Sequence, residues 1–124
     1  MATAQSRAVS TESLTNLHWA GVALAAITGV IHLVLAGSFI ASDLTSGLGW
    51  AFLVAALGFF GGIAAVLRDY RRRTFYLLGI PFTAGQIVAW YVANSPDFSP
   101  LGIGDKVVQV LLIVVLAVLY TNER

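Results

Sequence analysis

Residues 48–67 read LGWAFLVAALGFFGGIAAVL, an uninterrupted apolar run that ends at Arg68. An α-helix of roughly 20 apolar residues, rising about 1.5 Å per residue, is long enough to cross the roughly 30 Å hydrocarbon core of a bilayer. Three more runs have a similar character: residues 19–41, 74–93 and 100–120. The sequence therefore predicts an all-α, polytopic membrane protein whose four transmembrane helices form an up-down bundle.

The composition points to the same environment. The 124 residues include 7 basic and 6 acidic ones, and 58% of the chain is hydrophobic, with a mean hydropathy of +0.84. Soluble chains carry about a quarter charged residues, so this one is unsuited to water. This excludes a soluble enzyme, a nucleic-acid-binding protein and a disordered chain. There is no cysteine, which excludes disulfides, thiolate metal sites, iron–sulfur clusters and thiol catalysis.

The chain divides into a tail and one domain. Residues 1–17 are rich in Ser, Thr and Ala and are predicted to form a disordered cytoplasmic tail. A cleaved signal peptide is the alternative, but the tail has a single Arg and the apolar run after it is longer than a signal sequence requires. Residues 18–124 then form a single four-helix transmembrane domain. Its last span has a typical helix start, with Ser99 as N-cap and Pro100 at the first helical position.

The basic residues predict the orientation. The short connection between the second and third spans contains four arginines: Arg68, Arg71, Arg72 and Arg73. With four spans, both termini lie on that same side, which adds Arg7 and Arg124. Basic residues collect on the cytoplasmic side of membrane proteins. We therefore expect a multi-pass protein of the cell membrane with both termini in the cytoplasm; the four arginines could also bind anionic lipid headgroups.

Small residues predict where the helices pack, because helices in lipid associate through close approach. Eight of them follow helical spacing in the first and second spans: Gly21, Ala25 and Gly29, then Ala51, Ala55, Gly58, Gly62 and Ala65. Packing inside one bundle is the simpler interpretation. The alternative is an interface with a second copy of the chain or with a larger membrane protein.

Polar side chains at membrane depth are costly and often functional. The candidates are His32, Thr83, Gln86, Asp105 and Gln109. Counted from the outer helix ends, all but Thr83 lie roughly 8–13 Å below the outer surface. We therefore expect an outward-facing polar cluster between the first, third and fourth spans. Interhelical hydrogen bonding is the simpler role; binding or transport of a small solute or proton, with His32 as titrating group and Asp105 as counter-charge, is the alternative.

Other function classes fit poorly. A haem protein needs axial ligands on facing helices, whereas His18 and His32 share a helix and lie roughly 21 Å apart. Small multidrug transporters resemble this chain only in length and helix count, since its first span carries His32 where they carry a carboxylate. No catalytic or metal-binding motif is present. We expect no enzymatic activity, no cofactor, no metal and no nucleic-acid partner; the expected partners are the lipid bilayer and another membrane protein chain.

Three stretches resemble small four-helix membrane proteins found in haloarchaea: GVIHL at 29–33, LGIPFTAGQIVAWY at 78–91 and SPLGIGDKVVQVLL at 99–112. The resemblance covers most of the chain after about residue 18. It implies a four-span membrane protein and an archaeal source, but no activity, because that family is uncharacterised. We therefore predict a non-catalytic structural, accessory or interaction protein, with solute or proton binding as the alternative.

Overall fold

The computed structural model describes residues 13–123, which form four α-helices. Their bounds are α2 Asn16–Ser42, α3 Gly47–Leu67, α4 Arg72–Asn94 and α5 Pro100–Asn122. Each is long and apolar enough to span a membrane. This confirms the prediction of an all-α chain with four such helices, and each predicted span lies inside one of them.

The first helix begins with a reciprocal cap. Thr15 Oγ1 accepts a hydrogen bond from the His18 backbone N–H (3.4 Å), and His18 Nδ1 accepts one from the Thr15 N–H (3.0 Å). This capping box satisfies two backbone donors that a helix start leaves unpaired. Helix α2 therefore begins at Asn16, inside the segment 1–17 that was predicted as a disordered tail. Residues 1–12 of that segment lie outside the described part of the chain.

Serine caps start two of the other helices. Ser46 Oγ accepts from Gly49 N at the start of α3, and Ser99 Oγ accepts from Gly102 N at the start of α5, each over 3.0 Å. Pro100 follows Ser99 in the first turn, where its missing N–H costs nothing. The predicted start of the last span is thus confirmed.

Tight turns connect α2 to α3 and α3 to α4. After α2, Asp43 Oδ1 accepts from Thr45 Oγ1 (2.7 Å) and Thr45 N (2.9 Å), and these bonds lower the pKa of the Asp43 carboxyl. Between α3 and α4, Asp69 and Arg71 have positive φ angles of 51° and 47°. Residues in the left-handed region end a helix sharply, so the chain reverses within a few residues.

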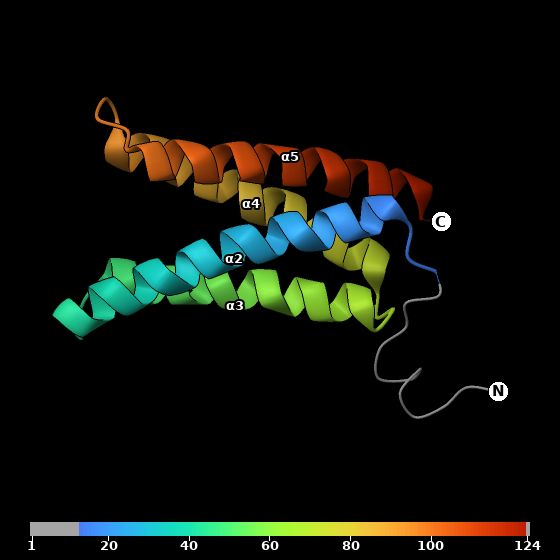
Figure 1. The fold of residues 1–124 in the computed structure, drawn as a ribbon, viewed down its shortest axis with the longest axis horizontal. Helices are drawn as coiled ribbons and strands as arrows, with labels where there is room; N and C mark the ends of the chain where they lie inside the picture. Colours follow the sequence, from blue (N-terminus) through green and yellow to red (C-terminus); the bar gives the residue numbers. More distant parts are fainter. Residues whose placement is uncertain (1–12, 124) are drawn as a thin grey trace.

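Consecutive helices run in opposite directions, as expected for an up-down bundle. Figure 1 shows the α3–α4 connection at the same end of the bundle as both ends of the described chain. We call this the basic end, because it carries Arg68, Arg71, Arg72 and Arg73. The α2–α3 and α4–α5 connections lie at the opposite end.

Helix α2 is the centre of the packing. It packs closely against α3 and also against α5, which in turn packs against α4. Glycines allow the close approach: a Cβ at Gly29 would lie 3.1 Å from the Phe60 ring, and one at Gly21 would lie 3.2 Å from Val115. Both belong to the small residues predicted to pack helices. The third, Ala25, lines a cavity described below.

Helices α3 and α4 contact each other far less than the other neighbouring pairs. Near mid-height, the rings of Phe59 and Phe82 pack edge to face, with centroids 5.2 Å apart. Gly58 lies directly against Phe82, and a Cβ there would clash with that ring. We call this loosely closed side the α3–α4 seam.

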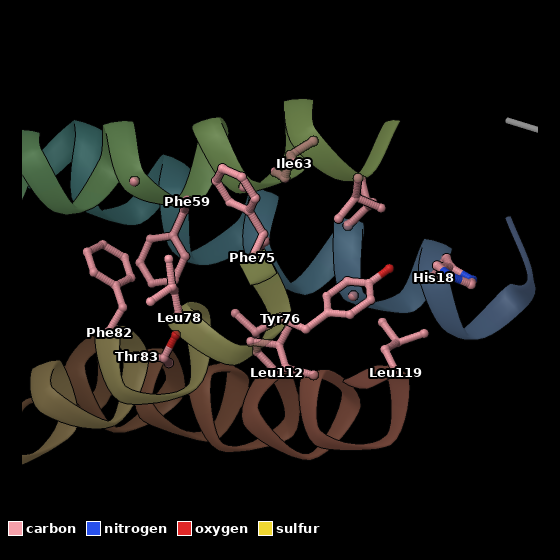
Figure 2. Close-up of a pocket in the computed structure, with 18 residues that line it drawn as sticks. His18, Phe59, Ile63, Phe75, Tyr76, Leu78, Phe82, Thr83, Leu112 and Leu119 are labelled. Atoms are coloured by element: carbon pink, nitrogen blue, oxygen red, sulfur yellow. The ribbon is translucent and has the colours of Figure 1, made fainter. Parts of the chain in front are cut away.

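A cavity of about 400 Å³ lies between the four helices in the half of the bundle nearer the basic end. Figure 2 shows its walls, which consist mainly of apolar side chains such as Phe59, Ile63, Leu78 and Leu112. We call it the apolar cavity. Over this half, the cavity lies where α3 and α4 are separated.

The predicted small-residue stripe of α3 is distributed over several environments. Ala55 and Ala65 are buried, Gly58 contacts Phe82, and Gly62 lines the apolar cavity. Ala51 is exposed. Most of the stripe therefore faces the interior of a single bundle rather than its outer surface.

The four arginines of the basic end do not act alike. Arg72 is only 5% exposed. Its Nε donates to the Val66 carbonyl (2.8 Å), one terminal nitrogen donates to Ser13 Oγ (2.6 Å), and the same nitrogen lies 3.4 Å from Asp69. It therefore holds the α3–α4 turn and the start of the described chain together. Arg72 is thus buried within the protein, whereas Arg68, Arg71 and Arg73 are exposed; headgroup binding by these arginines stays a prediction.

Candidate functional site

Six polar side chains from three helices meet in the half of the bundle away from the basic end. They are Thr28 and His32 of α2, Gln86 of α4, and Asp105, Lys106 and Gln109 of α5. We call them the polar cluster. All except Gln86 are buried, and Thr28 and Gln109 have no exposed surface (0%).

Asp105 is the only acidic residue of the polar cluster, and both its oxygens are hydrogen-bonded. Oδ1 accepts from Thr28 Oγ1 (2.7 Å) and Oδ2 accepts from Lys106 Nζ (2.7 Å). The Asp105 and Lys106 side chains are 4% and 11% exposed. An unpaired charge at this depth is strongly unfavourable, whereas a hydrogen-bonded ion pair is tolerated. Lys106 therefore neutralises Asp105 within the bundle.

Lys106 and Gln109 extend the network to α4. Lys106 Nζ also donates to Gln109 Oε1 (2.7 Å) and lies 5.9 Å from the centre of the Trp90 ring, within reach of a cation–π interaction. Gln109 Nε2 donates to Thr28 Oγ1 (3.1 Å) and to Gln86 Oε1 (3.2 Å). One amide of α5 is thus bonded to both α2 and α4.

The His32 ring packs against aromatic side chains of α3 and so connects the polar cluster to that helix. Its Nδ1 lies 2.7 Å from the Thr28 carbonyl oxygen; because a carbonyl can only accept, this nitrogen carries the proton. The same nitrogen is 3.3 Å from Thr28 Oγ1. The His32 ring lies 5.7 Å from both the Phe52 and the Phe59 rings of α3. Thr28 therefore stands between His32 and Asp105, the two residues that the alternative function names as titrating group and counter-charge.

The sequence named five residues for this site, and the structure brings four of them together: His32, Gln86, Asp105 and Gln109. The fifth, Thr83, lines the apolar cavity instead and is 1% exposed. The Thr83 hydroxyl has no hydrogen-bond partner among residues 13–123. Five of the six cluster members are buried, and Gln86 is partly exposed.

Two members of the polar cluster, Thr28 and Lys106, were not among the five candidate residues. Thr28 precedes His32 by four residues, and Lys106 precedes Gln109 by three, so each pair shares a helix face. For Thr28 this spacing is the signal in the sequence, whereas for Lys106 it gives only the helix face and not the turn of the side chain toward Asp105. The Lys106 side chain turns inward to Asp105.

Within the described residues, no three His, Asp or Glu side chains lie together in a way that could hold a metal ion. The polar cluster contributes only one histidine and one carboxylate, and both are already hydrogen-bonded. Its chemistry is that of a hydrogen-bonded network between helices.

Comparisons with known proteins place the chain in one family. No curated protein and no solved structure matches it. A family model described as "Family of unknown function (DUF7475)" matches residues 3–120, which include all of α2, α3 and α4 and nearly all of α5. The chain therefore belongs to this family of unknown function.

Proposed function

We propose that this is a non-catalytic membrane protein with a structural or accessory role, and that its polar cluster fixes the packing of α2, α4 and α5. One observation carries the proposal: every side chain of the polar cluster is hydrogen-bonded to another member. A solute could bind there only by displacing these bonds. The arrangement favours a role in holding the helices together.

The energetics agree with that role. An interhelical hydrogen bond in a membrane contributes about 0.6 kcal/mol on average, but bonds to charged groups contribute about 1.5–3 kcal/mol. Asp105 is such a group, and it is bonded to both α2 and its own helix. Because its partners lie on separate helices, the cluster specifies their relative register as well as their association.

Association with a second copy or with a larger membrane protein is part of the proposal. Every helix has at least one exposed glycine with no atom within 4 Å of the position of an added Cβ, among them Gly37, Gly61, Gly85 and Gly104. Another helix could approach closely at such positions, which supports an assembly but does not select its partner.

The proposal includes a location. We infer that the protein resides in the cell membrane with its basic end and both termini in the cytoplasm, as the positive-inside rule predicts. The grouping of Arg68, Arg71 and Arg73 at one end of four apolar helices supports this. An archaeal source stays a prediction from the resemblance.

Purification from native membranes tests the structural or accessory role. The tagged full chain, crosslinked in the membrane and extracted in a mild detergent, is expected to carry a second copy or a larger membrane protein, identified by mass spectrometry. Recovery as a monomer alone, with no crosslinked partner, would count against the proposal. A tag on either terminus that reacts with an impermeant reagent only after lysis supports the orientation; reaction on intact cells would reverse it.

A second candidate function is transfer or binding of a proton by the polar cluster. It rests on one observation: Thr28 Oγ1 lies within hydrogen-bonding distance of both His32 Nδ1 (3.3 Å) and Asp105 Oδ1 (2.7 Å), so one hydroxyl links the histidine to the carboxylate. Proteoliposomes with an internal pH-sensitive dye separate the candidates. The structural role predicts no proton flux above that of empty liposomes, whereas flux abolished by Asp105→Asn would favour the second candidate.

A further inference from the structure

The apolar cavity contains three polar atoms that have no hydrogen-bond partner among residues 13–123. They are His18 Nε2, Tyr76 Oη and Thr83 Oγ1, and all three residues line the cavity. His18 is 9% exposed and the other two are 1% exposed. A buried polar group without a partner is destabilising and rare in native proteins. Three of them around one cavity indicate that a bound molecule supplies the missing partners.

The His18 ring presents a donor to the cavity. Its Nδ1 accepts the hydrogen bond from the Thr15 backbone N–H at the start of α2, so in the neutral ring the proton must be on Nε2. Nε2 is the atom without a partner. His18 therefore offers an N–H group to whatever occupies the space beside it.

Tyr76 faces the same space from α4. Figure 2 shows its hydroxyl directed toward His18, and the two ring centroids lie 6.4 Å apart. A phenol hydroxyl can donate, so two donors from different helices meet at the end of the cavity nearest the basic end. Such a pair suits an oxygen acceptor: a carbonyl, hydroxyl or carboxylate oxygen.

The cavity opens sideways, at the α3–α4 seam. Among its lining residues, Leu78 and Phe82 of α4 are 57% and 37% exposed, whereas Leu112 and Leu119 of α5 are 2% and 3% exposed. The exposed edge thus lies between the two helices that contact each other least. In a protein whose helices span the bilayer, this edge faces lipid, so a molecule dissolved in the hydrocarbon phase has direct access.

We propose that the apolar cavity binds a single-chain lipid with an oxygen-bearing head group. The head group lies between His18 and Tyr76, and the hydrocarbon chain extends along the apolar walls toward Phe59 and Phe82. Thr83 follows Tyr76 by seven residues, roughly 10 Å along α4, where its hydroxyl can bind a second oxygen on the chain. The volume of about 400 Å³ falls in the roughly 300–1,000 Å³ range of small-molecule sites.

Water is the competing occupant, and the walls argue against it. An engineered apolar cavity of about 150 Å³ stays dry and binds benzene or xenon. Here the three polar atoms are divided between two ends of the cavity, and the surface between them is apolar. A few waters could pair with the polar atoms but would leave most of the volume without favourable contacts.

Photolabelling of the full chain in lipid nanodiscs tests the proposal. The probes are a C16 fatty acid and the matching C16 alcohol, each with a diazirine in the chain and a terminal alkyne, and the corresponding alkane without a head group. We expect the acid and the alcohol to label residues that line the cavity, and the alkane to label them several-fold less. Equal labelling by all three, or labelling spread over the outer helix faces, would overturn the proposal.

A neighbouring pair of glycines gives a matched control. Neither Gly61 nor Gly62 has an atom within 4 Å of an added Cβ, but only Gly62 lines the cavity. Gly62→Leu should therefore fill the cavity and reduce labelling by the fatty acid at least five-fold, while Gly61→Leu leaves it unchanged. A similar decrease in both variants, or in neither, contradicts a site in the cavity.

Tyr76→Phe gives a second test that does not depend on filling the cavity. It removes one donor to the head group, so half-saturation of labelling by the fatty acid should require about two- to ten-fold more probe. Without probe, thermal stability should be unchanged or raised, because the variant removes an unpaired buried hydroxyl. A merely structural hydroxyl predicts the reverse: lower stability and unchanged labelling.

Discussion

The two halves of the bundle treat buried polar groups in opposite ways. Away from the basic end, the polar cluster satisfies its members internally through bonds that join α2, α4 and α5. Nearer the basic end, His18, Tyr76 and Thr83 are buried without partners in the described chain and surround a cavity of about 400 Å³. In the first half, hydrogen bonds between polar side chains join the helices. In the second half, the polar side chains form no such bonds and a cavity separates the helices.

The difference changes where a binding site should be sought. Depth and polarity alone favour the polar cluster, because it contains the ionisable groups at membrane depth. Yet those groups already have partners, and a ligand there would have to compete with them. The three polar groups of the apolar cavity have no hydrogen bonds within the described chain that a ligand would have to displace. In this protein, the absence of a partner is the better indicator of a ligand than the presence of charge.

Breaking the ion pair of the polar cluster should have the largest effect. Lys106→Met leaves Asp105 buried with Thr28 as its remaining donor, and removing one member of a buried ion pair costs about 3–5 kcal/mol. We expect the free energy of unfolding, measured by reversible denaturation in mixed detergent micelles, to fall by about that much. The double variant Asp105→Asn with Lys106→Met should recover most of the loss. A decrease below about 1 kcal/mol in the single variant would mean that the pair is solvated.

A matched pair of threonine substitutions compares the two halves directly. Thr28→Val removes a hydroxyl that donates to Asp105 and accepts from Gln109, so it should destabilise the bundle by about 1.5–3 kcal/mol. Thr83→Val has the same shape change but removes a hydroxyl without a partner, so stability should stay constant or rise. Equal losses in the same unfolding assay would mean that the two halves do not differ as described.

Much of the fold could be predicted from the sequence, because the thickness of a bilayer sets the length of each apolar run. The Ser99-Pro100 pair marked one helix start correctly, since both residues suit that position for local reasons. The start of α2 is less obvious. It depends on a capping box in which His18 takes the place of the usual Glu or Gln, so residues 16 and 17 were assigned to the tail.

The site could be predicted only in part. Counting residues from the helix ends placed His32, Gln86, Asp105 and Gln109 at similar depth, and this depth does not depend on tertiary structure. Lys106 was missed because its role depends on a long side chain turning toward the adjacent residue, which no helical spacing encodes. Thr83 was misplaced because the cavity it faces exists only through the separation of α3 from α4, which is a property of the assembled bundle.

Glycine-to-alanine substitutions should give the smallest change in stability, and they compare how tightly the two halves of the bundle are packed. A Cβ at Gly49 would lie 2.9 Å from the Ile40 side chain and 3.2 Å from its backbone nitrogen, whereas one at Gly62 meets no atom within 4 Å. Because backbone cannot move aside cheaply, Gly49→Ala should cost about 1–3 kcal/mol. Gly62→Ala should be neutral or add up to about 1 kcal/mol through the higher helix propensity of alanine.

The sign of the difference between these two alanine variants matters more than its size. Both substitutions lie in α3 and make the same chemical change, so helix propensity acts on both in the same direction. Only the space around the new methyl group differs. If Gly62→Ala destabilised the protein as much as Gly49→Ala, the apolar cavity would have to be closed in the membrane. The half of the bundle nearer the basic end would then be packed as tightly as the half that contains the polar cluster.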